Sequence, residues 1–319
     1  MLYTLLKIPA WFAFRIYCRK LLVNNREVFN SNGPLLLAAN HPNSFLDAIT
    51  LATLFKNPVH SLTRGDVFAK GFFKNILTSL NMIPVYRISE GAENLGHNYK
   101  AFDQCREIFK QNGIVLIFSE GGCINEWHLR PLRKGTARLA ISAWQEGIPL
   151  RVLPVGINYQ SFSSFGKNIQ LNFGQPITEK DFDAGCTHGK SMGDFNIKLR
   201  DQLEQLVLEI DRKDCATLEQ KFKVRQHPLK KGLLLLPAIL GWFFHSGLYL
   251  PLRNYAWKKF AKDDHFDSVL VGLLFLIYPL LLLLISTLVS IFGGIWPGIL
   301  VFAALPFCAW SYVQLKRQF

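Results

Sequence analysis

The chain has 319 residues, of which 50% are hydrophobic and 13% aromatic, and its mean hydropathy of +0.16 is high for a soluble protein. Its 36 basic and 23 acidic residues give a formal net charge of +13, which suits anionic lipid or nucleic acid as a partner. The sequence has three long apolar segments and lacks the basic, aromatic-interleaved motif of an RNA-binding domain, so we expect membrane lipid and no nucleic acid.

Residues 1–28 mix aromatic, aliphatic and basic side chains. Basic residues interrupt the apolar run and no cleavage site follows it, so a signal peptide is not indicated. This mixture is typical of a helix that lies in the membrane interface, and we expect such a helix over 1–28.

Residues 29–226 alternate between short apolar runs and segments with helical spacing of apolar residues. The apolar runs predict strands over 34–40, 82–86, 113–118 and 150–159. The helical spacing predicts helices over 44–55, 67–80, 97–111 and 134–145, then an irregular stretch at 161–190 and a basic helical segment at 193–226. Strands that alternate with helices imply crossover connections, so we expect an α/β domain whose mostly parallel sheet is flanked by helices.

The C-terminal region, 227–319, contains three apolar segments close to the ~20 residues that span a bilayer. They are 232–252, 269–292 and 295–315. The second and third carry no charge and are predicted to be transmembrane helices. The first contains Pro237 and His245, and its placement stays open between spanning and re-entrant or interfacial.

The distribution of basic residues favours a re-entrant or interfacial placement of 232–252. If 232–252 spanned, the basic runs at 221–231 and 253–262 would lie on opposite sides of the membrane, against the positive-inside tendency. A re-entrant or interfacial segment puts both runs, and the 29–226 domain, on the cytoplasmic side. The six cysteines form neither metal-type pairs nor a dense disulfide framework, which suits a reducing compartment.

Polar features follow the predicted strands. His41, Arg87, Glu120 and the region of Pro154 lie at or just beyond the carboxyl end of a predicted strand. Ligands bind at that edge of open α/β sheets, so the pattern predicts one site where these residues converge.

His41 and Asp47 have the chemistry of a general base and the carboxylate that orients it. Six positions on a regular helix would place them on different faces, so they meet only if His41 precedes the helix and Asp47 faces back from its first turn. Pro42 disfavours helical backbone at His41, and the helix N-terminus would keep Asp47 ionised. The alternative is a capping box: Ser44 caps the helix with Asp47, and His41 is a bystander.

A second candidate stretch runs from 113 to 137. Glu120 stands beside Gly121 and Gly122, which allow the backbone to approach a ligand closely. Just before a predicted helix start, positive charge suited to a phosphate is supplied by Arg130, Arg133 and Lys134. Arg87 would add to it. The alternative is a tight turn followed by a solvated basic loop.

Two more motifs carry little weight. Gly189–Gly193 (GKSMG) matches the nucleophile-elbow pattern around Ser191, but polar, irregular residues precede it where the motif needs a buried strand. The eight histidines show no metal-ligand spacing, so we expect no metal site.

Taken in order, four stretches resemble the glycerolipid acyltransferase family, which includes lysophosphatidic acid and glycerol-3-phosphate acyltransferases. The resemblance covers roughly residues 30–180. His41 and Asp47 match the family's histidine–aspartate motif. The later blocks match IPVYR at 83–87, FSEG at 118–121 with LRPLRKG at 129–135, and LPVG at 153–156.

The resemblance implies transfer of an acyl group from an acyl thioester, acyl-CoA or acyl-carrier protein, to a hydroxyl of a phosphate-bearing glycerolipid in phospholipid synthesis. His41 would take the hydroxyl proton, Asp47 would orient His41, and Arg87 and Glu120 would shape the acceptor site. Amides near Gly121 and Gly122 would stabilise the oxyanion. No cofactor is implied beyond the thioester co-substrate.

The sequence departs from the family pattern in two places. Five residues, not the commoner four, separate His41 from Asp47, and Gly122 and Cys123 stand where the third block usually has threonine and arginine. Arg130, Arg133 or Lys134 would then bind the phosphate. The acceptor stays open between 1-acylglycerol-3-phosphate, which we favour, and glycerol 3-phosphate. Two competing hypotheses are a lipid hydrolase that uses Ser191 or water and a catalytically silent lipid-binding scaffold.

Overall fold

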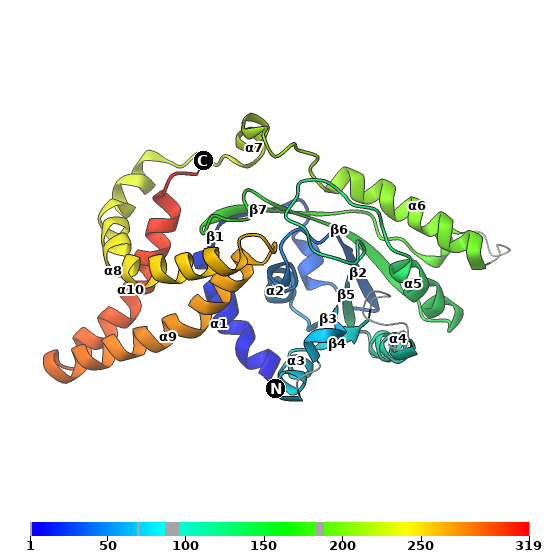
Figure 1. Cartoon of the computed structure of the whole chain (residues 1–319), viewed down its shortest axis with the longest axis horizontal. Coiled ribbons are helices and arrows are strands. Elements are labelled where there is room, and N and C mark those ends of the chain that lie inside the picture. Colours follow the sequence, from blue (N-terminus) through cyan, green and yellow to red (C-terminus); the bar gives the residue numbers. More distant parts are fainter. Residues whose placement is uncertain (1, 69–70, 87–95, 183–187, 319) are drawn as a thin grey trace.

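A computed structural model of the chain describes residues 2–68, 71–86, 96–182 and 188–318. Within these residues, seven strands form one sheet in the order β1-β7-β6-β2-β5-β3-β4 (Figure 1). The strands are β1 Cys18–Val23, β2 Leu35–Ala39, β3 Val59–Arg64, β4 Met82–Val85, β5 Ile114–Phe118, β6 Arg151–Tyr159 and β7 Lys167–Phe173. All neighbouring pairs are parallel except β6 with β7. The predicted α/β fold with a mostly parallel sheet is confirmed.

The central strand β2 is apolar throughout because helices cover both faces of the sheet. Leu35, Leu37 and Ala39 point into the core on one face, and Leu36 and Ala38 into the core on the other. In its register with β5, Ala39 lies opposite Phe118. The two strands therefore end level with each other, and the residues that follow them emerge at the same edge.

Helices cover the sheet in two layers (Figure 1). The first layer contains α1 Leu2–Tyr17 and α2 Phe45–Leu54, and the second contains α4 Gly96–Lys110, α5 Gly135–Gln145 and α6 His188–Leu206. Shorter elements complete the domain: η1 Glu27–Asn30, η2 Gly65–Phe68, α3 Gly71–Ser79, η5 Glu179–Asp181 and α7 Cys215–Phe222.

Three strands lie where we predicted none. The expected helix over 1–28 ends at Tyr17, and β1 follows it as the edge strand of the sheet, paired with β7. Strand β3 occupies part of the expected connection between two helices. Strand β7 lies in the stretch predicted to be irregular, although its alternation of buried Ile169, Leu171 and Phe173 with polar residues has the two-residue period of a strand. The basic segment 193–226 is divided into α6 and α7.

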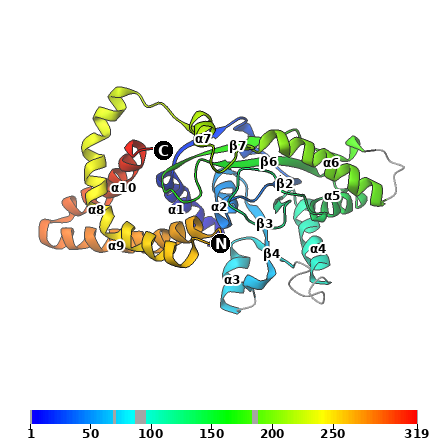
Figure 2. The same ribbon diagram turned by 45° about the horizontal axis from the view of Figure 1, so that its top comes forward.

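The C-terminal region forms three helices that project away from the sheet (Figures 1 and 2). They are α8 Pro228–Phe260, α9 Phe266–Gly293 and α10 Ile295–Leu315, and each is long and apolar enough to cross a membrane. Large apolar side chains on α8, such as Leu233 and Phe243, are exposed, as suits contact with lipid. Figure 1 shows that α8 changes direction along its course, and prolines 237 and 251 within it each remove a helical hydrogen bond.

Candidate active site

His41 and Asp47 lie within hydrogen-bonding distance, with 2.8 Å between Nδ1 of His41 and Oδ2 of Asp47. His41 is in the loop after β2, and Asp47 faces back toward it from the first turn of α2, the arrangement that the sequence required. The imidazole stacks on the ring of Phe118, with 3.8 Å between the ring centroids. An ionised carboxylate only accepts hydrogen bonds, so Nδ1 carries the proton and Nε2 is left as the basic nitrogen.

The Asp47 carboxylate is completely buried. Its Oδ2 also accepts the N–H of Asn43 at 2.8 Å. Burial raises the pKa of Asp47, while the hydrogen bond and charge of His41 and the Asn43 N–H act in the opposite direction. Ionisation of Asp47 therefore depends on these two partners as well as on the N-terminus of α2.

Ser44 occupies the N-cap position of α2, but its hydroxyl does not cap the helix. Its backbone has a φ of 52°, and its Oγ lies 2.8 Å from Nδ1 of His265. The Ser44 N–H donates to Sγ of Cys123 at 2.8 Å. The alternative interpretation of Ser-x-x-Asp as a capping box is therefore wrong, because both of its side chains bond elsewhere.

Glu120 connects the loop that contains His41 to the loop that contains Arg130. Its Oε2 accepts the His41 N–H at 2.8 Å and Nη2 of Arg130 at 2.9 Å, and its Oε1 accepts the Arg130 N–H at 2.9 Å. The side chain of Glu120 is only 3% exposed. These bonds occupy both carboxylate oxygens, so Glu120 shapes the site by holding the loops of His41 and Arg130 together.

The glycines after Glu120 have separate local roles. Gly121 has a φ of +71°, and a Cβ there would lie 2.9 Å from Cγ of Arg133, so only glycine fits. Its N–H donates to the Phe118 carbonyl at 3.1 Å, which makes this amide unsuitable for the expected oxyanion interaction. The carbonyl of Gly122 accepts a hydrogen bond from Nη2 of Arg130.

The three basic residues have different surroundings. Arg130 is bound to Glu120 and Gly122, whereas Arg133 and Lys134 are exposed at the start of α5. Lys134 is the N-cap residue of α5, and no side chain caps the helix there. Two exposed cations beside the amides of a helix N-terminus form a suitable place for an anion.

The predicted site also includes Arg87 and the region of Pro154. Arg87 lies outside the described residues. Pro154 lies inside β6, opposite Ala38 of β2, and the strand continues to Tyr159, so the prediction that its region ends a strand is wrong. The edge of β6 is joined to the site by Asn40, whose side chain bonds both backbone groups of Ile157.

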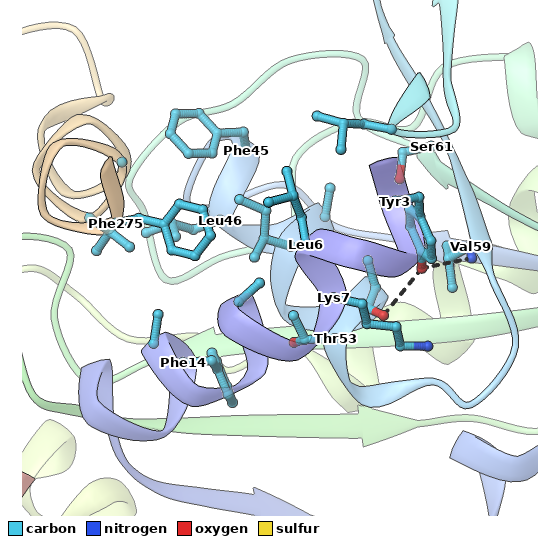
Figure 3. Close-up of a pocket in the computed structure, with 18 of the residues that line it drawn as sticks. Tyr3, Leu6, Lys7, Phe14, Phe45, Leu46, Thr53, Val59, Ser61 and Phe275 are labelled. Atoms are coloured by element: carbon cyan, nitrogen blue, oxygen red, sulfur yellow. Dashed lines mark hydrogen bonds between the residues drawn. The ribbon is translucent and has the colours of Figure 1, made fainter. Parts of the chain in front are cut away.

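An apolar pocket of about 320 Å³ lies between α1, α2 and α9 (Figure 3). Its walls include Leu6 of α1, Leu46 and Ile49 of α2, and Phe275 of α9. Asp47 is turned by about 200° round the axis of α2 from Ile49. The pocket and the His41–Asp47 pair therefore lie on opposite faces of α2, and Phe45, at the N-terminus of this helix, also lines the pocket.

Sequence reasoning missed several residues of the site because their partners are far along the chain. Asn43 and Ser44 bond residues of α9 and of the turn before it. Cys123, one of the positions where the sequence departs from the pattern it resembles, accepts the Ser44 N–H, and burial raises its pKa to about 12, so it is a neutral thiol. Ser191 lies in the first turn of α6, and no described strand directly precedes that helix, so the nucleophile-elbow match lacks its required context.

Comparison with known proteins gives one family match. The Acyltransferase family profile matches residues 20–158. No curated protein matches the chain significantly. Among solved structures, a similarity is found to the crystal structure of the 1-acyl-sn-glycerophosphate (LPA) acyltransferase, PlsC, from Thermotoga maritima, with a TM-score of 0.45 and 16% identity, over 70% of this chain and 81% of that chain.

Proposed function

We propose, from the match of residues 20–158 to the Acyltransferase family profile, that the chain transfers a fatty acyl group from an acyl thioester to a hydroxyl of a phosphate-bearing glycerolipid. The acceptor that we propose is 1-acylglycerol-3-phosphate, with glycerol 3-phosphate as the alternative. The donor is acyl-CoA or acyl-carrier protein, and the proposal calls for no further cofactor.

The 2.8 Å contact between His41 and Asp47 carries this proposal. Asp47 holds the imidazole with the proton on Nδ1, so Nε2 accepts the proton of the acceptor hydroxyl as its oxygen attacks the thioester carbonyl. The carbon–sulfur bond then breaks, and the leaving thiolate takes the proton from the imidazolium. The acceptor itself is the nucleophile, so no serine or cysteine has to be acylated.

The basic edge supports a phosphate-bearing acceptor. We assign the phosphate to Arg133, Lys134 and the first amides of α5, which lie beside the loop that contains Glu120. Arg130 and Glu120 keep this loop against the backbone of His41. An acceptor anchored there would have its hydroxyl presented to the edge from which His41 emerges.

The apolar pocket supports a lipid substrate. It lies between α1, for which we predict contact with the membrane interface, and α9, which is long enough to span the bilayer. A hydrocarbon chain in the pocket would pass the N-terminus of α2 at Phe45 to bring its polar end toward His41. We propose that this pocket holds an acyl chain of the donor or the acceptor.

The test uses the purified full-length protein in detergent and in lipid vesicles. Radiolabelled acyl-CoA or acyl-carrier protein is supplied with glycerol 3-phosphate, 1-acylglycerol-3-phosphate or other lysolipids. We expect transfer to 1-acylglycerol-3-phosphate, and we expect His41→Ala to lower the rate by about 10²- to 10⁴-fold. His128→Ala, at an exposed histidine that pairs with Glu126, is the matched control and should retain the wild-type rate.

Each competing function has its own outcome. Release of free fatty acid without dependence on an acceptor would identify a hydrolase. Binding of lipid without turnover on any acceptor would identify a scaffold. Transfer that survives His41→Ala would overturn the assignment of His41 as the base.

A further inference from the structure

The loop that carries His41 is held by the start of the membrane helix α9. Asn43 lies between two carboxylates: its backbone N–H donates to Asp47 at 2.8 Å, and its side-chain Nδ2 donates to Oδ2 of Asp267 at 2.8 Å. Ser268, the next residue of α9, donates from Oγ to the Asn43 carbonyl at 3.1 Å. The first turn of α9 thus fixes both the side chain and the main chain of the residue that binds Asp47.

Pro42 and Ser44, the neighbours of Asn43 in the loop, are also connected to the turn that precedes α9. His265 bonds the hydroxyl of Ser44. Asn125 donates from Nδ2 to the Pro42 carbonyl, and its N–H donates to Asp264 at 3.3 Å. Pro42, Asn43 and Ser44 are therefore all connected to residues 264–268.

Asp267 is itself held by elements distant in the sequence. Its Oδ2 accepts the hydroxyl of Tyr17, from α1, at 2.5 Å and is paired with Nζ of Lys167, from β7. Asp267 and Lys167 are 1% and 0% exposed. Removing two charges from water carries a desolvation cost that can exceed their mutual attraction, so a buried pair is weak evidence for stability alone. Its position next to Asn43 indicates a use in the site.

We propose that the first turn of α9 is a clamp that positions the Asp47 carboxylate through Asn43, with Asp267 and Ser268 as positioning residues. The proposal rests on the proposed function of His41 and Asp47. Asp267 fixes the orientation of the Asn43 side chain, and Ser268 fixes the orientation of the Asn43 carbonyl. Together these two bonds orient the Asn43 N–H toward Asp47. The membrane helix is then part of the catalytic apparatus and not only an anchor.

Ser268→Ala is the principal test, because it removes one bond and leaves the buried Asp267–Lys167 pair intact. We expect kcat to fall by about 10-fold for Ser268→Ala and about 10²-fold for Asn43→Ala, with unchanged KM for donor and acceptor, since small misplacements of catalytic groups cost this much. Ser286→Ala is the matched control. Ser286 is a buried serine of the same helix whose Oγ has no hydrogen-bond partner among the described residues, and its substitution should leave kcat unchanged.

Repeating both substitutions in an Asp47→Asn background separates positioning from structure. If the clamp acts through Asp47, Ser268→Ala and Asn43→Ala should cause no further loss there. An equal loss in both backgrounds, or a loss matched by Ser286→Ala, would overturn the clamp.

A readout without turnover keeps the clamp distinct from the proposed function. In ¹⁵N-histidine-labelled protein, the resonance that His41→Ala removes reports whether Nδ1 of His41 is protonated. We expect a single Nδ1-protonated form in the wild type and a mixture of tautomers in Ser268→Ala and Asn43→Ala. An unchanged spectrum in both variants would refute the clamp. An inactive wild type with these spectral changes would refute the proposed function and leave the clamp standing.

Discussion

At the scale of single residues, the burial of Asp47 opposes the ionised form that His41 needs. Its pKa is raised above the ordinary value of about 3.9. Between that value and the raised one, the folded protein binds more protons than the unfolded chain, so stability falls as the pH rises through this interval. Above the interval the whole penalty is present.

We therefore predict that Asp47→Asn separates stability from activity. The amide would still accept the Asn43 N–H but would donate to Nδ1 of His41, which moves the imidazole proton to Nε2 and removes the base. The rate should fall by about 10²- to 10⁴-fold. Thermal unfolding at pH 7 should show a melting temperature equal to or above that of the wild type, and any gain should vanish below about pH 4. A lower melting temperature at pH 7 would mean that the bonds of Asp47 outweigh its burial.

The residues predictable from sequence were those whose partners are set by local geometry. His41 and Asp47 are six positions apart, and Pro42 and the start of α2 determine how they meet. Glu120 was predicted to lie near His41 because both residues follow the ends of strands, and β2 and β5 do end level. That both oxygens of Glu120 accept hydrogen bonds within the protein was not predictable, because it depends on Arg130. Asn43 gave no signal, because its partner Asp267 is 224 positions away.

At the scale of elements, three of the four predicted strands, β2, β5 and β6, are buried on both faces, and the fourth, β4, is a short, partly buried strand at the edge of the sheet. β2 and β5 are short unbroken apolar runs, which a parallel interior strand requires. β1 and β7 contain lysines, and one of them, Lys167, is buried because Asp267 pairs with it. A lysine normally indicates an exposed position. The start of β7 at Lys167 could therefore be recognised only once the pairing of Lys167 with Asp267 of α9 was known.

The pocket between α1, α2 and α9 gives a prediction at this scale. Ala52 lines it and is half-buried, so Ala52→Phe would fill part of the space without touching the opposite face of α2. If the pocket holds an acyl chain, the preferred chain should become shorter, because the ring excludes the terminal carbons. Competition between thioesters, and between lysolipids, of different chain length measures this preference.

The matched control for this substitution is Ala216→Phe, at an exposed position of α7. It should leave the chain-length preference unchanged. Unaltered preference in Ala52→Phe, with full activity on long-chain donors and acceptors, would show that neither chain enters the pocket.

At the scale of the whole molecule, the sequence predicts a catalytic domain and a separate membrane region. In the structure, the two are joined at the start of α9 and at the end of α10, the two ends of the pair of consecutive helices. The start of α9 holds the His41 loop through Asn43. The end of α10 is held by Arg19 of β1, whose Nε donates to the Val313 carbonyl at 2.9 Å. Hydropathy and charge identify apolar helices, but they carry no information about which polar residue of such a helix enters a distant site.

These contacts place α8 as well. Its first turn contacts the end of α10, where Nζ of Lys230 donates to Gln314 at 2.9 Å, and its last turns pack near the start of α9, where Trp257 contacts Phe266. Both ends of α8 are thus next to helix ends that touch the catalytic domain. A straight span would put them about 50 Å apart on opposite sides of the membrane, since 33 residues rise 1.5 Å each. The bend in α8 (Figure 1) is consistent with an interfacial or re-entrant course.

We predict that position 258, near the end of α8, lies on the same side of the membrane as the catalytic domain. Lys258→Cys is introduced into a chain that carries Cys215→Ser and Cys186→Ser, because Cys215 is exposed and would react on its own. In sealed vesicles of known orientation, a membrane-impermeant maleimide should label position 258 only from the side that also labels Cys215 in the otherwise unaltered chain. Labelling only from the opposite side would make α8 a complete span. Its last turn would then lie on the other side of the membrane from Arg133 and Lys134. That outcome would contradict the contacts of Asn43 with Asp47 and Asp267, because they hold the start of α9 against the His41 loop.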